Sequence, residues 1–269
     1  MSGSGSNGRG GGLPLVQLRP ATETAADRMP AVEMYADARG MGEPITEDTP
    51  TERIIAWTLD RFSHFRKVIT TSFGMEGCAL IDLYARQGVP LTVVYLDTMF
   101  FFPETYELRN RMVARYPNVT FINRGTTMTP EEQEAKYGPE LWKHNPDQCC
   151  QIRKVDPMFD VMADYDVWIT ALRRSQSSTR ANMRLVEWDW KYQVLKVNPM
   201  IKWERDDIWK YIKEHDVPYN KLHEQGYPTI GCTHCTNPVE GLKMGEYSRE
   251  GRWTGTPKTE CGLHGGAGI

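Results

Sequence analysis

The stretch VITTSFGMEGCALIDLYARQGVPLTVVYL, residues 68–96, decides the fold class of this chain. It opens with a β-branched run at 68–72, which predicts a buried strand. A helical pattern follows at 76–87 and stops at Gly88, and a second β-branched run at 91–96 predicts another strand. A strand, a helix and a strand in this order are typical of a parallel sheet with helices on its faces.

The same alternation continues on both sides of this stretch. The sequence predicts helices at 52–65, 103–116 and 204–215, a helix capped by Thr129, strands at 118–123 and 167–172, and a hairpin formed by 185–188 and 194–197. We therefore expect an α/β fold with a mostly parallel sheet and helices on both faces. Sheets of this kind bind ligands in the loops at the carboxyl ends of their strands.

The length of 269 residues corresponds to one or two domains at roughly 150 residues each. Residues 1–12 hold six Gly and three Ser without apolar periodicity. We expect a flexible N-terminal segment at 1–49 and one domain at 50–269. Periodicity fades after Val217, which predicts a loop-rich C-terminal region with a catalytic tail from about residue 237.

The overall charge is nearly balanced, with 32 Lys and Arg against 35 Asp and Glu and a net charge of −3. This balance argues against a nucleic-acid partner and an anionic membrane surface. The sequence has no apolar run near the roughly 18 residues of a membrane-spanning helix, and it has no secretory signal pattern at its start. We therefore expect a cytoplasmic protein, and the sequence does not decide whether it is a homo-oligomer.

Polar loops follow three of the predicted strands. The loop at 71–77 would present backbone N–H groups and the Ser72 hydroxyl to an anion, although a tight turn that binds nothing would look the same. Asp97 ends the second strand, where a turn residue is the simpler interpretation. The loop at 171–180 carries three arginines, which suit a phosphate or sulfate group unless they form a solvated basic loop.

The six cysteines carry the most specific signal: Cys78, Cys149, Cys150, Cys232, Cys235 and Cys261. In a cytosolic chain they favour metal binding or catalysis over disulfides. The tandem pair and the C-x-x-C motif supply four thiolates, the number that a [4Fe–4S] cluster needs, and zinc is the alternative ligand. Cys78 lies on an apolar helix face and is expected to be a buried small hydrophobe.

Cys261 stands apart from the other cysteines, in the segment Lys-Thr-Glu-Cys-Gly-Leu-His at 258–264. Its thiolate would be a nucleophile, and the nearby cationic side chains would stabilise that form. An ordinary surface thiol is the alternative interpretation.

Taken together, these motifs resemble the assimilatory sulfonucleotide reductase family, and specifically its iron–sulfur branch, the adenosine 5'-phosphosulfate (APS) reductases. The resemblance runs from about residue 50 to 264. It is carried by Ser72-Phe-Gly-Met-Glu76, Leu96-Asp-Thr98, Cys149-Cys150 with Arg153-Lys-Val, Leu172-Arg-Arg, Thr179-Arg-Ala, Gly231-Cys-x-x-Cys235, Gly251-Arg-Trp253 and the Glu-Cys-Gly-Leu-His segment.

The resemblance implies a fold similar to the adenine-nucleotide α-hydrolases and a role in sulfate assimilation and cysteine biosynthesis. It further implies that Cys261 attacks the substrate sulfur, releases AMP and forms a cysteine S-sulfonate, which thioredoxin or a glutaredoxin-like donor reduces to sulfite. The implied cluster ligands are Cys149, Cys150, Cys232 and Cys235, with one [4Fe–4S] cluster per chain. The implied substrate contacts are Ser72, Phe73, Gly74, Glu76, Asp97, Lys154, Arg173, Arg174, Arg249, Arg252 and His264.

Three other functions fit the sequence less well. A reductase that prefers the 3'-phosphorylated substrate (PAPS), or accepts both, is the nearest, although enzymes committed to PAPS generally lack the four cysteines. A tRNA-thiolating enzyme would need an intact Ser-Gly-Gly loop and a basic surface, neither of which is present. A zinc-stabilised binding module would hold zinc in place of iron.

Overall fold

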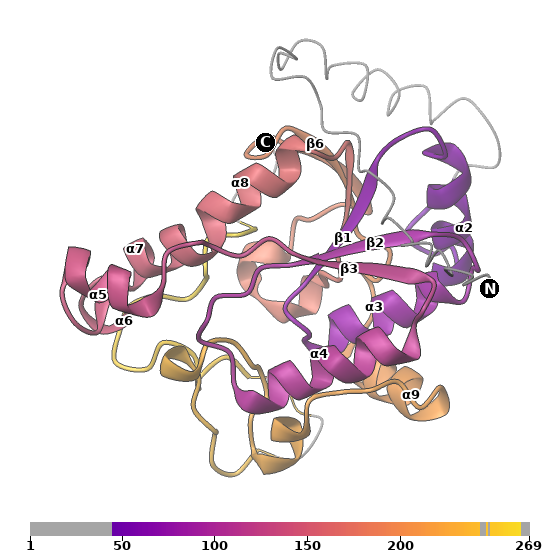
Figure 1. Ribbon diagram of the computed structural model, residues 1–269. Helices are drawn as coiled ribbons and strands as arrows, with labels where there is room; N and C mark the ends of the chain where they lie inside the picture. The colour runs from indigo at the N-terminus through magenta and orange to yellow at the C-terminus, as the bar shows by residue number, and fades with distance from the viewer. Residues whose placement is uncertain (1–44, 243–245, 247, 265–269) are drawn as a thin grey trace, which may run out of the picture.

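The computed structural model describes residues 45–242, 246 and 248–264 and contains a six-stranded sheet (Figure 1). Its strands are β1 (Lys67–Thr71), β2 (Leu91–Tyr95), β3 (Val119–Asn123), β4 (Val167–Ile169), β5 (Val186–Asp189) and β6 (Val194–Val197). They lie in the order β3-β2-β1-β4-β6-β5, and all neighbours are parallel except β5 and β6. The predicted parallel sheet with one hairpin is therefore confirmed.

Helices cover both faces of this sheet. The longer ones are α2 (Thr51–Arg61), α3 (Met75–Ala85), α4 (Pro103–Arg115), α5 (Pro130–Tyr137), α8 (Asp156–Ala163) and α9 (Arg205–Glu214). Apolar side chains of α2, α3, α4 and α9 form one large core with the sheet, whereas α8 forms a second core on the opposite face (Figure 1). Nearly every side chain of α3 is buried, including Cys78, as predicted for an apolar helix face.

One helical segment was not predicted from the sequence. It contains α6 (Leu141–His144), α7 (Pro146–Cys150), the π-helix η2 (Gln151–Val155) and α8. Pro146 and Pro157 stand in the first turns of α7 and α8, where a missing N–H costs nothing. This segment carries the tandem cysteines to the edge of the sheet.

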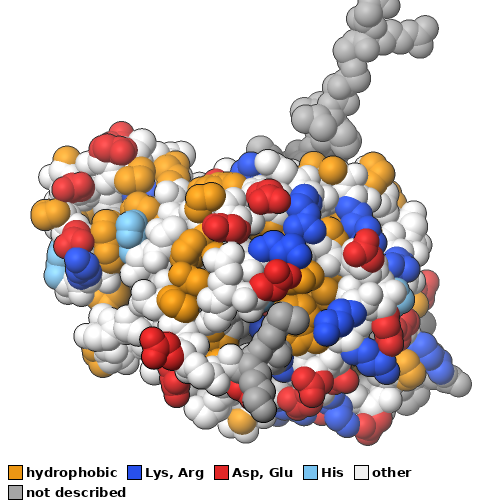
Figure 2. Space-filling view, turned by 90° about the horizontal axis from the view of Figure 1, so that it is seen from below, with side chains coloured by type: hydrophobic (Ala, Val, Ile, Leu, Met, Phe, Trp, Pro, Cys, Tyr) orange, Lys and Arg blue, Asp and Glu red, His pale blue; other side chains and the backbone are white. Residues whose placement is uncertain are grey.

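Short 3-10 helices replace regular structure in the loops near the carboxyl ends of the strands. They are η3 (Arg174–Gln176), η4 (Ser178–Arg180), η5 (Lys221–Gln225) and η6 (Thr233–Cys235). The expected N-terminal segment at 1–49 lies almost entirely outside the described residues. In the part of the chain that is described, no helix has the length and apolarity to cross a membrane. Figure 2 shows acidic and basic side chains interspersed on the face seen from below.

Candidate active site

A pocket opens at the carboxyl ends of β1, β2 and β4, where a parallel sheet is expected to bind ligands. Its volume is about 230 Å³. The sheet side of its wall comes from the loop after β1 and from Leu96, Thr98 and Leu172. The rest of the wall carries most of the charged groups and the Cys261 thiol. Lys154 comes from η2 and Arg180 from the loop after β4, whereas the others come from the chain after β6: Arg205, His223, Arg249, Arg252, Glu260, Cys261 and His264.

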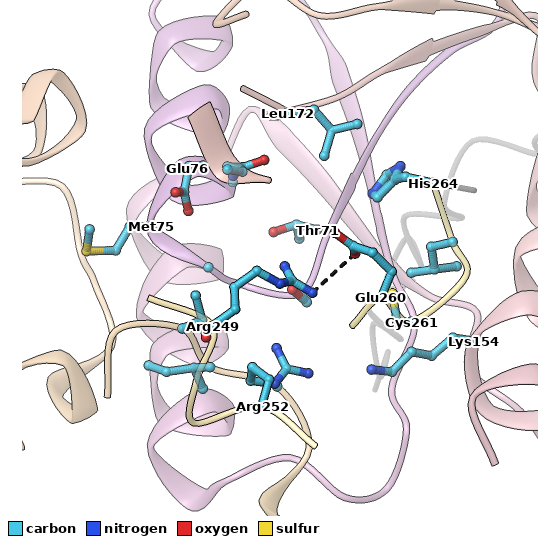
Figure 3. A pocket seen from close by; sticks show the side chains of 18 of the residues that line it. Thr71, Met75, Glu76, Lys154, Leu172, Arg249, Arg252, Glu260, Cys261 and His264 are labelled. Atoms are coloured by element: carbon cyan, nitrogen blue, oxygen red, sulfur yellow. Dashed lines mark hydrogen bonds and ion pairs between the residues drawn. The ribbon is translucent and has the colours of Figure 1, made fainter. Parts of the chain in front are cut away.

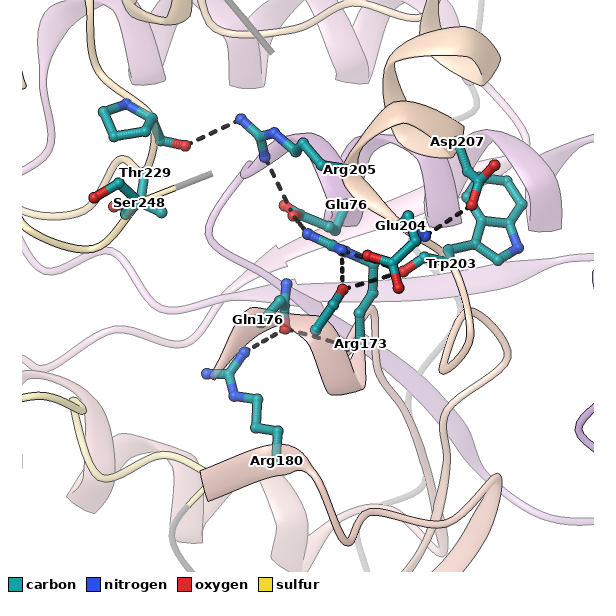
Figure 4. Close-up of polar contacts among 12 residues, drawn as sticks. Glu76, Arg173, Gln176, Arg180, Trp203, Glu204, Arg205, Asp207, Thr229 and Ser248 are labelled. Atoms are coloured by element: carbon teal, nitrogen blue, oxygen red, sulfur yellow. Dashed lines mark hydrogen bonds and ion pairs between the residues drawn. The ribbon is translucent and has the colours of Figure 1, made fainter. Parts of the chain in front are cut away.

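The loop after β1 is held at one wall of the pocket by a buried ion-pair cluster (Figure 4). Arg173 Nη2 donates to Glu76 Oε1 at 2.9 Å, and Arg205 Nη1 lies 3.3 Å from the same oxygen. Burial alone would raise the pKa of Glu76, but Arg205 and Arg173 outweigh it and hold the pKa at about 2. Glu76 therefore stays ionised and ties the first turn of α3 to the start of α9.

Cys261 lies in the wall of the pocket, half-buried, next to a second carboxylate that is also held by two arginines. Arg180 Nη2 and Arg249 Nη2 each lie 3.2 Å from Glu260 Oε2, and the Ser177 hydroxyl donates to Glu260 Oε1 at 3.2 Å. Figure 3 shows Arg249 reaching across the pocket to Glu260. These contacts fasten the tail on the N-terminal side of the thiol.

On the other side of Cys261, the tail packs against the second face of the sheet. Lys191 Nζ donates to the Gly262 carbonyl at 2.6 Å, and Leu263 contacts the apolar core beneath α8. The His264 ring stacks on Trp168 with centroids 5.0 Å apart. Burial and the nearby cations hold the pKa of His264 well below its usual range, so its imidazole is neutral at pH 7.

Cationic side chains converge on the thiol from two directions. Arg252 donates from Nε to the Cys235 carbonyl at 3.1 Å and lies over the Trp253 ring. Burial alone would lower the pKa of Lys154, but the thiol groups of Cys232, Cys261 and Cys150 raise it above its usual range. Lys154 is thus charged. It lines the pocket beside Cys261 (Figure 3), and it also lines the cavity of the other four site cysteines.

The four remaining site cysteines surround one small cavity, which Phe100, Trp142 and His234 also line. Cys149 and Cys150 come from α7, Cys232 directly precedes η6, and Cys235 is the last residue of η6. Burial and the three neighbouring thiols raise the pKa of Cys149 to about 12, and burial with Cys232 raises that of Cys235 to about 11. The described residues contain no group of three or more His, Cys, Asp and Glu side chains arranged around a single metal ion.

The protein around this cysteine cavity is aromatic and cationic. The Trp142 and His234 rings stack at 3.9 Å, and Phe100 meets both edge-on. Arg153 is fully buried, lies over the Phe100 ring, and donates to Gln133 and to three backbone carbonyls. Cys261 packs against the cluster formed by Cys232, Cys235 and Trp253, so the Cys261 thiol and the cysteine cavity are neighbours.

Most of the predicted substrate contacts are brought together in the pocket wall. They are Ser72, Gly74, Glu76, Lys154, Arg249, Arg252 and His264. Two others are directed elsewhere. The Phe73 side chain is 2% exposed and packs on Tyr95 and Phe121 in the core. The Asp97 carboxylate accepts from the Met99 N–H and the Tyr106 hydroxyl, which makes it a turn residue.

The two arginines predicted in the loop after β4 also lie outside the pocket wall. Arg173 is buried beneath the wall, where it neutralises Glu76. Arg174 pairs with Glu47 and donates to the Met183 carbonyl on the outer side. The guanidinium of this loop that reaches the pocket is Arg180, at the end of η4.

Four titratable residues of the pocket wall were not predicted from the sequence as site residues: Arg180, Arg205, His223 and Glu260. Arg180 and Glu260 belong to two of the sequence motifs given above. Their position in those motifs could have identified them as site residues. Arg205 begins an ordinary amphipathic helix, and His223 lies in an aperiodic segment. Neither had a local signal, because tertiary packing brings them to the pocket.

Comparison with known proteins identifies the family. Residues 66–238 match the phosphoadenosine phosphosulfate reductase domain. The chain is 47% identical to the adenosine 5'-phosphosulfate reductase of Shouchella clausii over 78% of its length and 86% of that protein. It is 42% identical to the protein of the same name from Lysinibacillus sphaericus, over 78% of this chain and 89% of that one.

Solved structures agree with this fold. A phosphoadenylyl-sulfate (PAPS) reductase from Candida auris superposes with a TM-score of 0.63 and 25% identity, covering 77% of this chain and 96% of that one. A yeast FAD synthetase shares the fold alone, with a TM-score of 0.52 and 13% identity over 83% of this chain and 79% of that one. The chain therefore belongs to the phosphoadenosine phosphosulfate reductase family, and its relatives include adenosine 5'-phosphosulfate reductases.

Proposed function

We propose that this protein is an adenosine 5'-phosphosulfate reductase that uses Cys261 as its nucleophile. The observation that carries the proposal is the position of Cys261 in the wall of a cationic pocket at the carboxyl end of the sheet, with Lys154, Arg249 and Arg252 around it. The names of relatives at 42–47% identity support the same substrate. A phosphosulfate group is anionic and suits guanidinium donors.

The first step is attack of the Cys261 thiolate on the sulfur of the sulfonate group. A sulfur–sulfur bond forms, the bond between sulfur and the bridging oxygen breaks, and AMP leaves with that electron pair. Lys154 and Arg252 are placed to neutralise the negative charge that develops on the bridging oxygen. The product on the enzyme is a cysteine S-sulfonate.

The second step needs a dithiol donor, for which thioredoxin or a glutaredoxin-like protein is the proposed partner. A donor thiolate attacks the Cys261 sulfur, and sulfite leaves with the electron pair of the broken sulfur–sulfur bond. The second donor thiol resolves the mixed disulfide, so that two electrons come from the donor. None of the six cysteines forms a disulfide in the structure, which is consistent with the proposed location in a reducing compartment, the cytoplasm.

The four-cysteine cavity suits a [4Fe–4S] cluster better than a single metal ion. A single zinc ion needs its four ligands at one point, whereas a cubane takes each thiolate on a different iron. Four buried thiols around one cavity, with no carboxylate in its wall, fit the second arrangement. When bound, the cluster would supply a fixed negative charge beside Lys154. Cys149, Cys150, Cys232 and Cys235 would hold it.

Intact-mass spectrometry of anaerobically purified protein incubated with APS and no thiol tests the proposal. We expect one added SO3 unit, mapped to the peptide that contains Cys261. The Cys261→Ser variant should form no adduct while it keeps its iron. An adduct on another residue would contradict Cys261 as the nucleophile.

The same preparation separates the alternatives. Equal adduct formation from APS and PAPS would indicate dual specificity, and formation from PAPS alone would overturn the APS assignment. Iron and acid-labile sulfide are expected in the wild type and lost in Cys150→Ala. Zinc without iron would refute the cluster and leave the cysteine cavity as a zinc site.

A further inference from the structure

His223 is a pocket residue that the proposed chemistry does not use. It lies in η5, which follows α9, and the residue is 7% exposed. His223 lines the pocket together with Arg205 and Pro228, and Figure 4 shows Arg205 between Glu76 and the segment that contains Thr229. Trp209 meets the His223 ring edge-on at 6.2 Å and limits its rotation.

The hydrogen bonding of His223 fixes its tautomer. Nδ1 lies 2.7 Å from the Tyr227 carbonyl oxygen, and a carbonyl only accepts, so Nδ1 carries the hydrogen. In the neutral ring Nε2 is then an acceptor. Burial and the charge of Arg205 lower the pKa of His223 to about 4, which keeps the imidazole neutral at pH 7.

The Nε2 atom is buried and has no hydrogen-bond partner among the described residues. A buried acceptor without a partner is destabilising, so such atoms call for an explanation. The neighbouring charged group is Arg205, which is engaged by Glu76 and by the Pro228 carbonyl. Nε2 of His223 is therefore an acceptor without a partner among the described residues, and it suits a ligand that brings a donor.

The two ends of the pocket also carry different charged groups. Figure 3 shows Glu76 on the side away from Cys261 and Lys154. If the sulfonate lies at Cys261, the anionic end of the substrate meets the cations there. The nucleoside half, with its ribose hydroxyls and its adenine amino group, then extends toward Glu76 and His223.

We propose that Nε2 of His223 accepts a hydrogen bond from an O–H or N–H group of the nucleoside half of the substrate. His223 would thus bind a neutral donor group of the substrate, whereas the arginines would bind its anionic group. The inference rests on the proposed function, because it needs a nucleotide in this pocket.

Calorimetric titration of the anaerobically purified protein with AMP tests it. We expect His223→Leu to weaken AMP binding about 5- to 20-fold, because a donor of the ligand loses its acceptor. His223→Gln should stay within about threefold of wild type, since the amide oxygen is a replacement acceptor. His64→Leu is the matched control, because His64 is exposed at the end of α2, and it should bind AMP as the wild type does.

Three analogues then identify the donor: 2'-deoxy-AMP, 3'-deoxy-AMP and purine riboside 5'-monophosphate, each of which lacks one donor group. One of them should bind the wild type about 5- to 20-fold more weakly than AMP and should show no further loss with His223→Leu. Equal losses for all analogues in both proteins, or unchanged AMP binding by His223→Leu, would overturn the inference. A wild type that binds no AMP would contradict the proposed function itself.

Discussion

Two carboxylates of this pocket are each held by two arginines, yet they belong to different parts of the molecule. Glu76 begins α3 and is bound by Arg173 and Arg205, which adjoin β4 and begin α9. Its side chain is 13% exposed. Glu260 lies in the irregular tail beside Cys261, and its side chain is 25% exposed. The first carboxylate is part of the framework, and the second fastens a segment that covers the pocket.

The comparison shows that the effect of an arginine–carboxylate pair depends on how deeply it is buried and on which part of the fold carries it. Breaking a buried pair leaves charges that water cannot reach, whereas a more exposed pair exchanges its partner for water or another anion at little cost. We therefore expect the Glu76 cluster to control stability. We expect the Glu260 cluster to control ligand affinity and the position of Cys261.

The largest effect should come from removing the framework carboxylate. Glu76→Ala leaves Arg173 and Arg205 without their shared partner and should lower the free energy of unfolding by about 3–5 kcal/mol. Urea denaturation measures this change. Glu107→Ala, an exposed position on α4, should change it by less than about 0.5 kcal/mol. Equal changes in the free energy of unfolding for Glu76→Ala and Glu107→Ala would contradict the stabilising role of Glu76.

Acid should weaken the framework through the same residue. The pKa of Glu76 is about 2 in the folded protein and near 4.5 when unperturbed. A lowered folded-state pKa contributes stability above the unfolded value, here about 3 kcal/mol, and this stability is lost as the pH falls from about 4.5 toward 2. Urea denaturation between pH 7 and 3 should show this loss in the wild type. Glu76→Gln should lack that component, and parallel pH profiles would contradict it.

Glu260, the carboxylate of the tail, should affect ligand binding more than stability. Glu260→Gln should change the free energy of unfolding by less than about 1 kcal/mol, because its pair is more exposed. AMP binding should become about two- to fivefold tighter, since the Glu260 charge no longer competes for Arg180 and Arg249. S-sulfonate formation should slow, because the tail next to Cys261 is held less firmly. Weaker AMP binding with unchanged S-sulfonate formation would contradict this role.

The smallest effect is expected from the hydroxyl that supports Glu260. Ser177→Ala removes one neutral hydrogen bond and leaves both arginines in place. Such a bond contributes about 1 kcal/mol or less. Limited proteolysis of the segment 253–264 should accelerate no more than about threefold. A rate as high as that of Glu260→Gln would show that the hydroxyl, and not the arginines, anchors the tail.

The framework could be predicted from the sequence because its signals are local. Apolar runs, Gly88 and Pro103 mark where strands and helices end or begin, and the observed elements follow the predicted ones within a few residues. The segment with the tandem cysteines was missed because its prolines interrupt every helical pattern. In the structure those prolines begin helices.

Seven of the predicted substrate contacts lie in the pocket wall, but the positions of the others could not be predicted. The loop after β4 has no periodicity, so the sequence could not show that Arg180 lines the pocket while Arg173 lies beneath it. The same holds for His223, whose burial depends on the packing of η5 against α9. Residue types at the ends of strands indicate the chemistry of a site, but the direction of each side chain in a loop depends on tertiary contacts.

The position of β1 in the middle of the sheet also affects the order in which the parts of this site form during folding. Val68 pairs with Trp168, so the sheet closes only after a further hundred residues have been synthesised. Closing so long a loop carries an entropic cost that slows folding. The Cys261 tail follows every strand along the chain and leaves the ribosome after them, at about 5–20 residues per second. Cys261 therefore reaches the site after the strands have been synthesised and are able to pair.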